Sequence, residues 1–112
     1  MPDAELLPGT LDLLILKSVS LGRQHGYGVL LRIQQITGQA LKIEQGALYP
    51  ALYKLETRGE LSAEWGVSEN NRRAKFYSLT PAGRKRLRDE VSGWNRLTTA
   101  MTTALKATAE EL

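Results

Sequence analysis

The 112-residue chain contains no cysteine and only one histidine. Without cysteine it can form no disulfide framework, no thiolate zinc site and no cysteine nucleophile. His25 lacks the partner ligands of a metal site, so we expect it to be a turn residue before Gly26. The sequence also lacks a Ser-His-Asp set, paired carboxylates in a plausible pocket and a glycine-rich phosphate loop after a strand. These absences argue against an enzyme, and we expect no cofactor and no metal.

Long hydrophobic runs are also missing. The longest aliphatic cluster, residues 13–16, is bracketed by Asp12 and Lys17 and is too short to span a bilayer. Asp3 and Glu5 stand where a signal peptide would carry basic residues. We therefore expect a cytoplasmic protein with no membrane partner. The length and the 42% hydrophobic content indicate one compact globular unit.

Acidic residues are absent from residues 72–88, although the chain as a whole carries a net charge of only +3. Seven of its 15 basic residues lie there: Arg72, Arg73, Lys75, Arg84, Lys85, Arg86 and Arg88. Such a segment indicates either a polyanionic partner or a solvated face. The place of this segment in the fold decides between the two.

Apolar periodicity predicts three helices, over residues 10–21, 27–37 and 46–58. Thr10 follows Pro8-Gly9 and is the expected N-cap of the first helix. In the third helix Leu48, Leu52 and Leu55 form a buried stripe, and Gly59 is expected to end it. Residues 40–43 alternate in polarity and indicate an extended connector or a very short strand.

A β-hairpin follows the third helix. Leu61, Ala63, Trp65 and Val67 alternate with polar residues or glycine, which predicts a half-buried strand with Trp65 in the core. Residues 75–79 read as the returning strand, and the turn between the two strands is polar. Thr80 and Pro81 then supply the N-cap and the first-turn proline of a last helix, over residues 81–107.

The last helix is too long to be covered by the small domain before it, since it would measure roughly 40 Å. Apolar or small side chains recur along it in steps of four and three, as in a coiled-coil seam. They are Leu87, Val91, Trp94, Thr98, Met101 and Leu105. A second copy of the chain is the simplest cover for this seam. For Trp94 we favour packing in the dimer over ligand binding.

Three helices, a hairpin and a long helix in this order describe a winged helix-turn-helix, mainly α with a small β-hairpin. Residues 1–80 form the DNA-binding part and residues 81–112 the dimerisation helix. The third helix would enter the major groove, and the basic hairpin tip would lie along the neighbouring backbone. The expected contacts are Gln45, Gly46, Tyr49, Pro50, Tyr53 and Lys54 from the helix and Asn70, Asn71, Arg72, Arg73 and Lys75 from the wing.

The sequence also resembles PadR-type transcriptional regulators, in particular the compact branch with a single C-terminal helix. The matching motifs are GTLDLLIL (residues 9–16), HGYG (25–28), GALYPALYKLETRG (46–59), SENNRRAKFYSLTPAGR (68–84) and Trp94. The resemblance implies a homodimeric repressor that binds double-stranded DNA. A dimer with two-fold symmetry should in turn require an inverted repeat. The resemblance also implies a dimer made largely by the last helix, helped by the first through Leu11 and Leu14. An effector would have to sit between the helices of the dimer.

A second reading of the same fold is a winged helix that serves as a protein-interaction or assembly module. In that case the aromatic face of the third helix would meet a protein instead of DNA. Salt dependence separates the two functions, because a regulator that neutralises phosphates binds duplex DNA more weakly as salt rises.

Overall fold

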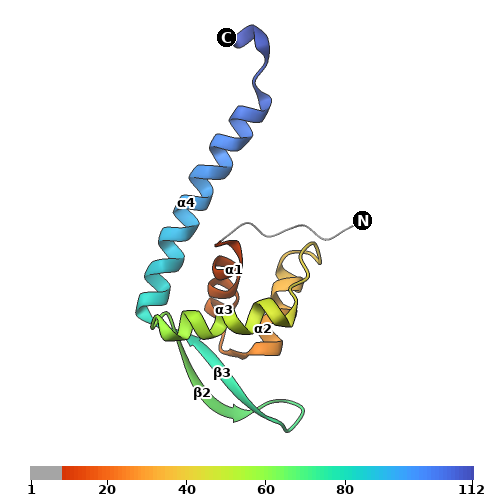
Figure 1. The fold of residues 1–112 in the computed structure, drawn as a ribbon, viewed down its shortest axis with the longest axis vertical. Helices are drawn as coiled ribbons and strands as arrows, with labels where there is room; N and C mark the ends of the chain where they lie inside the picture. The colour runs from red at the N-terminus through yellow and green to blue at the C-terminus, as the bar shows by residue number, and fades with distance from the viewer. Residues whose placement is uncertain (1–8) are drawn as a thin grey trace.

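The computed structural model describes residues 9–112, which form four α-helices and a three-stranded antiparallel sheet (Figure 1). In chain order the elements are α1 (Thr10–Ser20), β1 (Gln24–His25), α2 (Gly26–Ile36), α3 (Gln45–Thr57), β2 (Leu61–Val67), β3 (Arg73–Leu79), α4 (Pro81–Lys106) and the short 3-10 helix η1 (Ala109–Glu111). The predicted fold class is confirmed. Asp3 and Glu5 lie outside the described residues.

The core lies between α1, α2 and α3 and is closed by the base of the hairpin. Its most deeply buried large side chains are Ile15, Leu16, Val29, Ile33, Leu48, Leu52, Leu55 and Leu61. The three leucines of α3 have no exposed surface, which confirms the predicted stripe. Each contributes about 1.5–3 kcal/mol by leaving water, so α3 is fixed to the body by one face only.

The helix ends agree with the sequence in part. The side chain of Thr80 caps α4 by accepting a hydrogen bond from the Gly83 N–H at 3.0 Å, as predicted. Gly59 follows α3 with a φ of 75°, the left-handed conformation of a glycine that ends a helix. The prediction for Thr10 was wrong. Thr10 is the first helical residue, and the N-cap is Gly9, with a φ of 84° and no side-chain hydrogen bond.

The sheet contains one strand more than the predicted hairpin. β2 and β3 pair antiparallel from Leu61 opposite Leu79 to Val67 opposite Arg73. The two-residue strand β1 adds to the other edge of β3, giving the order β1-β3-β2. So short a strand leaves no period-2 pattern in the sequence, since alternation needs four or more residues to be visible. Residues 40–43 are an extended connector without a strand.

Trp65 is not in the core, contrary to our prediction. Its side chain lies on the same face of β2 as the buried Leu61, but 60% of it is exposed. The alternation was correctly read; the hairpin simply extends past the body that covers its base (Figure 1). An inward-facing position on a strand is buried only where something lies opposite it.

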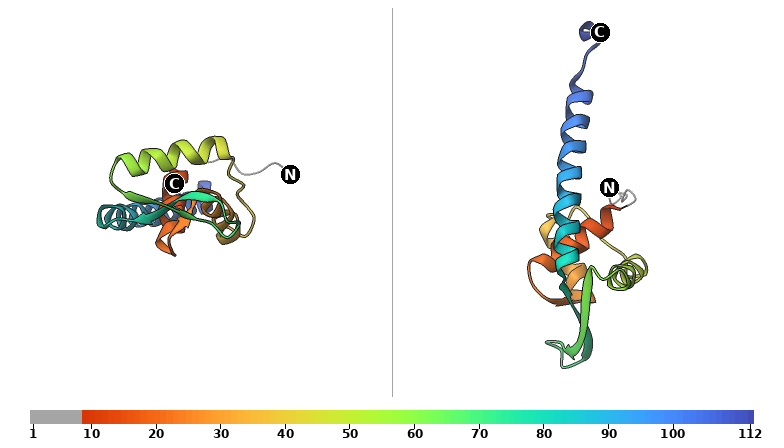
Figure 2. Two further views of the ribbon diagram at one scale, coloured as in Figure 1. Left: turned by 90° about the horizontal axis from the view of Figure 1, so that it is seen from below. Right: turned by 90° about the vertical axis from the view of Figure 1, so that its left-hand side faces the viewer.

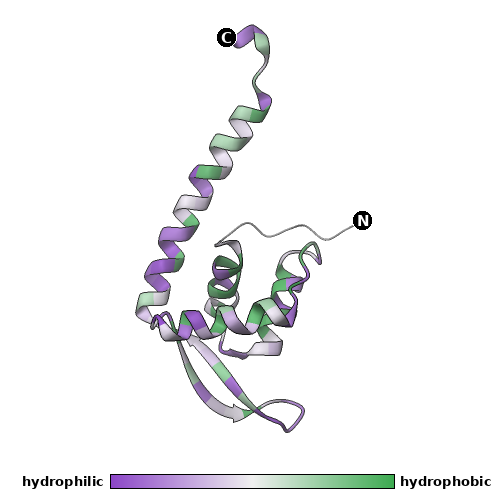
Figure 3. Ribbon diagram, in the orientation of Figure 1, coloured by the Kyte–Doolittle hydropathy of each residue, from purple (hydrophilic) through white to green (hydrophobic). Residues whose placement is uncertain are grey.

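Helix α4 leaves the body in the direction away from the hairpin, so the molecule measures 62 × 35 × 20 Å (Figure 2). Only its first turns pack on the body, where Leu87 contacts the core. At its start Gly83 is buried, and a Cβ there would overlap the carbonyl oxygen of Glu60. Hydrophobic bands recur along the free part of α4 (Figure 3).

Candidate nucleic-acid interface

The side of α3 opposite the buried leucines faces solvent. Tyr53 is 69% exposed and Tyr49 is 44% exposed, and Gln45, Gly46 and Pro50 are exposed in the first two turns. The exposed aromatic face that periodicity predicted is therefore present. Its position on the N-terminal and middle turns suits a helix that reads a DNA groove, because such helices use chiefly their N-terminal half.

The wing tip is a tight turn between β2 and β3. The Ser68 N–H donates to the Arg72 carbonyl at 2.8 Å, and the Asn71 N–H donates to the Ser68 carbonyl at 2.9 Å. Asn71 has a φ of 57°, a left-handed conformation that asparagine adopts more readily than most residues. Asn70, Asn71 and Arg72 are all exposed, so the turn presents amides and a guanidinium to solvent.

Arg73 and Trp65 form a stacked pair on the exposed part of the wing. The guanidinium carbon of Arg73 lies 4.5 Å from the centre of the Trp65 ring. A cation–π contact at an exposed site contributes about 0.5–1 kcal/mol. It also holds the guanidinium over the face of the indole ring. Both side chains belong to the hairpin face whose base packs through Leu61, so they face the space beside α3. Sequence reasoning missed this role for Trp65.

Lys75 connects the wing to α3. Its ammonium lies 2.7 Å from Oε1 of Glu56, and this hydrogen bond raises the pKa of Lys75 above its ordinary value. Lys75 therefore stays charged, and the carboxylate of Glu56 offsets part of that charge before DNA binds. It differs in this respect from Arg72 and Arg73, which have no carboxylate partner among residues 9–112.

Lys54 is also held by a carboxylate. Its ammonium lies 2.8 Å from Oδ2 of Asp12, a residue of α1 that is only 5% exposed. The same oxygen lies 3.2 Å from Nη2 of Arg86 at the start of α4, and Nη1 of Arg86 lies 2.7 Å from Glu60. Burial lowers the pKa of Arg86, but its hydrogen bonds to Glu60 and Asp12 outweigh this effect and raise it. Asp12 therefore joins α1, α3 and α4.

Asp12 was missed as a site residue, although its position in the sequence carries a signal. It precedes Ile15, Leu16 and Val19 at the spacing of one helical face, and all three are buried. A charged residue on a buried stripe needs a partner. Arg86 belongs to the basic segment of residues 72–88, but its guanidinium is paired with Asp12 and Glu60 inside the protein.

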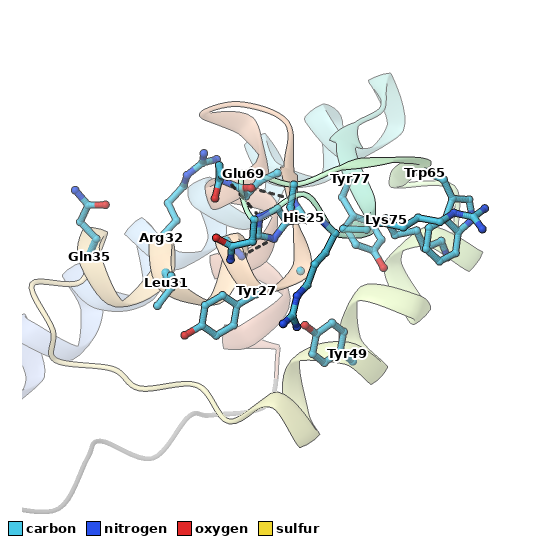
Figure 4. Close-up of a pocket in the computed structure, with 18 residues that line it drawn as sticks. His25, Tyr27, Leu31, Arg32, Gln35, Tyr49, Trp65, Glu69, Lys75 and Tyr77 are labelled. Atoms are coloured by element: carbon cyan, nitrogen blue, oxygen red, sulfur yellow. Dashed lines mark hydrogen bonds and ion pairs between the residues drawn. The ribbon is translucent and has the colours of Figure 1, made fainter.

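A cleft of about 940 Å³ lies between α2, α3 and the hairpin (Figure 4). Tyr27 and Arg32 line it from α2, Tyr49 from α3, and Trp65 and Arg73 from the wing. These five side chains make their part of the lining aromatic and cationic. A DNA strand that passes from a groove occupied by α3 to the wing would run along this cleft, where cations and backbone N–H groups contact phosphates.

His25 caps α2 at the edge of this cleft. Its Nδ1 accepts a hydrogen bond from the Gly28 N–H at 3.1 Å, and its ring packs edge-on against Phe76 at 5.4 Å. The other ring nitrogen lies 3.8 Å from Glu69 and has no hydrogen-bond partner among the described residues. His25 therefore lies in β1 and orders the start of α2, a more defined role than the turn residue that we predicted.

The free part of α4 exposes the predicted seam. The exposed fractions of Val91, Trp94, Met101 and Leu105 are 40%, 42%, 50% and 80%. Leu97, which the step pattern did not include, is 51% exposed beside them. A row of large apolar side chains on a helix that packs on nothing else marks an interaction surface.

Three packed helices, the third with one exposed face, and a basic hairpin together define a winged helix-turn-helix protein. The model of the Transcriptional regulator PadR-like family matches residues 15–89. The chain belongs to this family and is a DNA-binding transcriptional regulator, not an enzyme. Among residues 9–112 no helix has the length and hydrophobicity to cross a membrane.

Solved structures of similar proteins agree with this assignment. A transcriptional regulator from Clostridium thermocellum shares 26% identity, with a TM-score of 0.76 over 85% of this chain and 92% of that one. A PadR family transcriptional regulator from Eggerthella lenta shares 27% identity, with a TM-score of 0.75 over 89% of this chain and 85% of that one. An uncharacterised protein X of Lysinibacillus sphaericus is 26% identical over 94 residues, which cover 84% of this chain and 86% of that protein.

Proposed function

We propose that the protein is a homodimeric, sequence-specific transcriptional repressor that binds an inverted-repeat operator. The observation that carries this proposal is the exposed seam of α4. Exposed apolar side chains that repeat in steps of four and three along one helix are best covered by the same seam of a second copy. In this dimer residues 81–112 hold the two copies together, and residues 1–80 of each copy bind DNA in the cytoplasm.

The seam residues contribute unequally. Val91, Trp94, Met101 and Leu105 are exposed and are available to pack against a partner. Leu11, Leu14 and Leu87 already pack partly against the core of their own chain, so they add a smaller surface. The hydroxyl of Thr98 donates to the Trp94 carbonyl at 3.0 Å, which satisfies it without a partner and leaves its methyl group for the seam.

The DNA geometry follows from two-fold symmetry. The reading face of α3 would enter one major groove in each half-site, and the half-sites would lie about 34–36 Å apart, or a multiple of that distance. Gln45 would pair with an adenine edge, and Tyr53 would pack against bases. Arg72 and Arg73 of each wing would contact the phosphate backbone. Repression follows if the operator overlaps a promoter, because the bound dimer then excludes RNA polymerase.

Selection of bound duplexes from a random library is the most informative test. We expect an enriched inverted repeat, bound by two copies of the chain in sedimentation experiments, and lower transcription from a promoter that contains it. An enriched site without two-fold symmetry would contradict the dimeric part of the proposal. No enrichment, with binding that does not depend on salt, would instead indicate a protein-interaction module.

A further inference from the structure

We propose that Asp12 determines DNA specificity by neutralising Lys54, so that this lysine strengthens binding to the operator but not to random DNA. The inference rests on the proposed function, in which α3 is the reading helix. Asp12 itself would touch no DNA. It would act on recognition through Lys54, and through the buried contacts that hold the pair in place.

The ammonium of Lys54 lies at the boundary between solvent and the buried carboxylate of Asp12. Lys54 lies next to Tyr53 on α3, and 44% of its side chain is exposed, whereas the carboxylate of Asp12 is almost completely buried. Their atoms are 2.8 Å apart, the distance of a charge-assisted hydrogen bond. The lysine can therefore turn toward a ligand in the groove, but only by giving up this carboxylate.

Asp12 can lose Lys54 without being left unpaired. An isolated carboxylate in the protein interior is strongly unfavourable, but Arg86 also lies 3.2 Å from the same oxygen of Asp12. Arg86 is itself held in place by Glu60 at 2.7 Å. The pair of Asp12 and Arg86 therefore remains when Lys54 leaves, and the exchange of partners does not disrupt the junction of α1 and α4.

The exchange favours one kind of DNA over another. On random duplex the alternative partner of Lys54 is a hydrated phosphate, which offers an ammonium little more than Asp12 does. On an operator the fitted groove offers base-edge acceptors such as the O6 and N7 atoms of guanine. Lys54 would then add to the difference between specific and non-specific affinity rather than to both.

The test compares the wild type with Asp12→Asn on a random-sequence duplex at a series of salt concentrations. The asparagine keeps the size of Asp12 and an acceptor for Arg86 but removes the charge that holds Lys54. We expect tighter binding to random duplex and a slope of log affinity against log salt that is steeper by about 0.9, the value for one more phosphate contact. Adding Lys54→Gln to Asp12→Asn should restore the wild-type slope.

Glu60→Gln is the matched control, because it removes the nearest carboxylate partner of Arg86 and leaves Lys54 with Asp12. It should not change the slope. An unchanged slope for Asp12→Asn, or a steep slope that persists after Lys54→Gln is added, would overturn the inference. Wild-type protein that binds neither random nor selected duplex at low salt would overturn the proposed function itself.

A second measurement does not depend on the folding of Asp12→Asn. In the wild-type background, Lys54→Gln should leave the affinity for random duplex and its salt slope unchanged, and it should weaken binding to the selected operator at least several-fold. Equal losses on both duplexes would show that Lys54 contacts phosphate whatever the sequence, and the inference would fail.

Discussion

The ammonium of Lys75 on β3 lies 2.7 Å from the carboxylate of Glu56 on α3, so an ion pair joins the wing to this helix. Both side chains are about a third exposed. Because Glu56 already neutralises part of its charge, we expect Lys75 to contribute less to phosphate binding than Arg73. Lys75→Gln should flatten the salt dependence of DNA affinity less than Arg73→Ala does, as measured by fluorescence anisotropy on random duplex.

The control for this prediction is Glu56→Gln, which removes the neutralising charge. In that background Lys75→Gln should flatten the slope by the full value of about 0.9 for one phosphate contact. If Lys75→Gln and Arg73→Ala have equal effects in the wild-type background, the ion pair does not restrain Lys75 in the complex.

Arg73 should contribute a backbone contact that is independent of sequence. We expect Arg73→Ala to weaken binding to all duplexes alike and to flatten the slope of log affinity against log salt by about 0.9. Arg73→Lys keeps the charge but not the planar group that stacks on Trp65, so it should retain the slope and lose part of the affinity. A slope that Arg73→Ala leaves unchanged would remove the wing from the interface.

The seam of α4 should hold the dimer. Val91→Glu combined with Met101→Glu would bury unpaired charges between the two copies, which is strongly unfavourable. We expect this variant to sediment as a monomer with an unchanged helix content. Thr103→Glu is the matched control, because Thr103 follows Met101 by two residues and lies on the side of the helix opposite the seam. A dimer that survives the double substitution would rule out the seam.

Tyr53 should carry sequence discrimination. It is more exposed than Tyr49, the other tyrosine of α3, and Tyr53→Ala should cost roughly 1–3 kcal/mol on the selected operator while the fold and the dimer persist. Tyr53→Phe keeps the ring and separates stacking from hydrogen bonding by the hydroxyl. Competition between operator and random duplex measures the effect. If the ratio of the two affinities is the same in wild type and Tyr53→Ala, Tyr53 does not read the sequence.

Trp94 allows a direct test for an effector site in the dimer. In a Trp65→Phe background it is the only tryptophan of the chain, so fluorescence reports on it alone. If the space between the two α4 helices accepts flat aromatic compounds, they should quench this fluorescence and lower operator affinity over the same concentration range. Quenching without a change in DNA binding would show a pocket that has no regulatory role.

The sequence predicted the elements whose patterns extend over several turns or residues. The leucines of α3, the hairpin alternation and the cap at Thr80 are local signals, and each was correct. It failed where the outcome depends on distant partners. Trp65 has the pattern of a core residue, but only tertiary structure shows that it lies beyond the helices that bury the base of the hairpin. β1 is too short to produce a pattern, and it exists because β3 offers it a free edge.

The candidate site shows the same division. Exposure of Tyr49 and Tyr53 follows from the helical period, so it could be predicted. The ion pairs of Lys54 and Lys75 could not be predicted, because their partners Asp12 and Glu56 are 42 and 19 positions away in the chain. Only the tertiary structure brings these side chains together. A cation on an exposed face was taken as available to DNA, but that availability depends on the nearest carboxylate.

The junction between β3 and α4 has a mechanical consequence. The hydroxyl of Thr80 donates to the Gly59 carbonyl at 2.6 Å, its N–H donates to the Glu60 carbonyl at 3.2 Å, and Gly83 leaves no room for a side chain. This joint cannot swivel without breaking those contacts. In the proposed dimer each winged helix-turn-helix would therefore move with its own α4 as one rigid body. A small change in the crossing angle of the two α4 helices would move both α3 helices at once. The distance between the two operator half-sites would therefore be set where the α4 helices cross, far from the DNA.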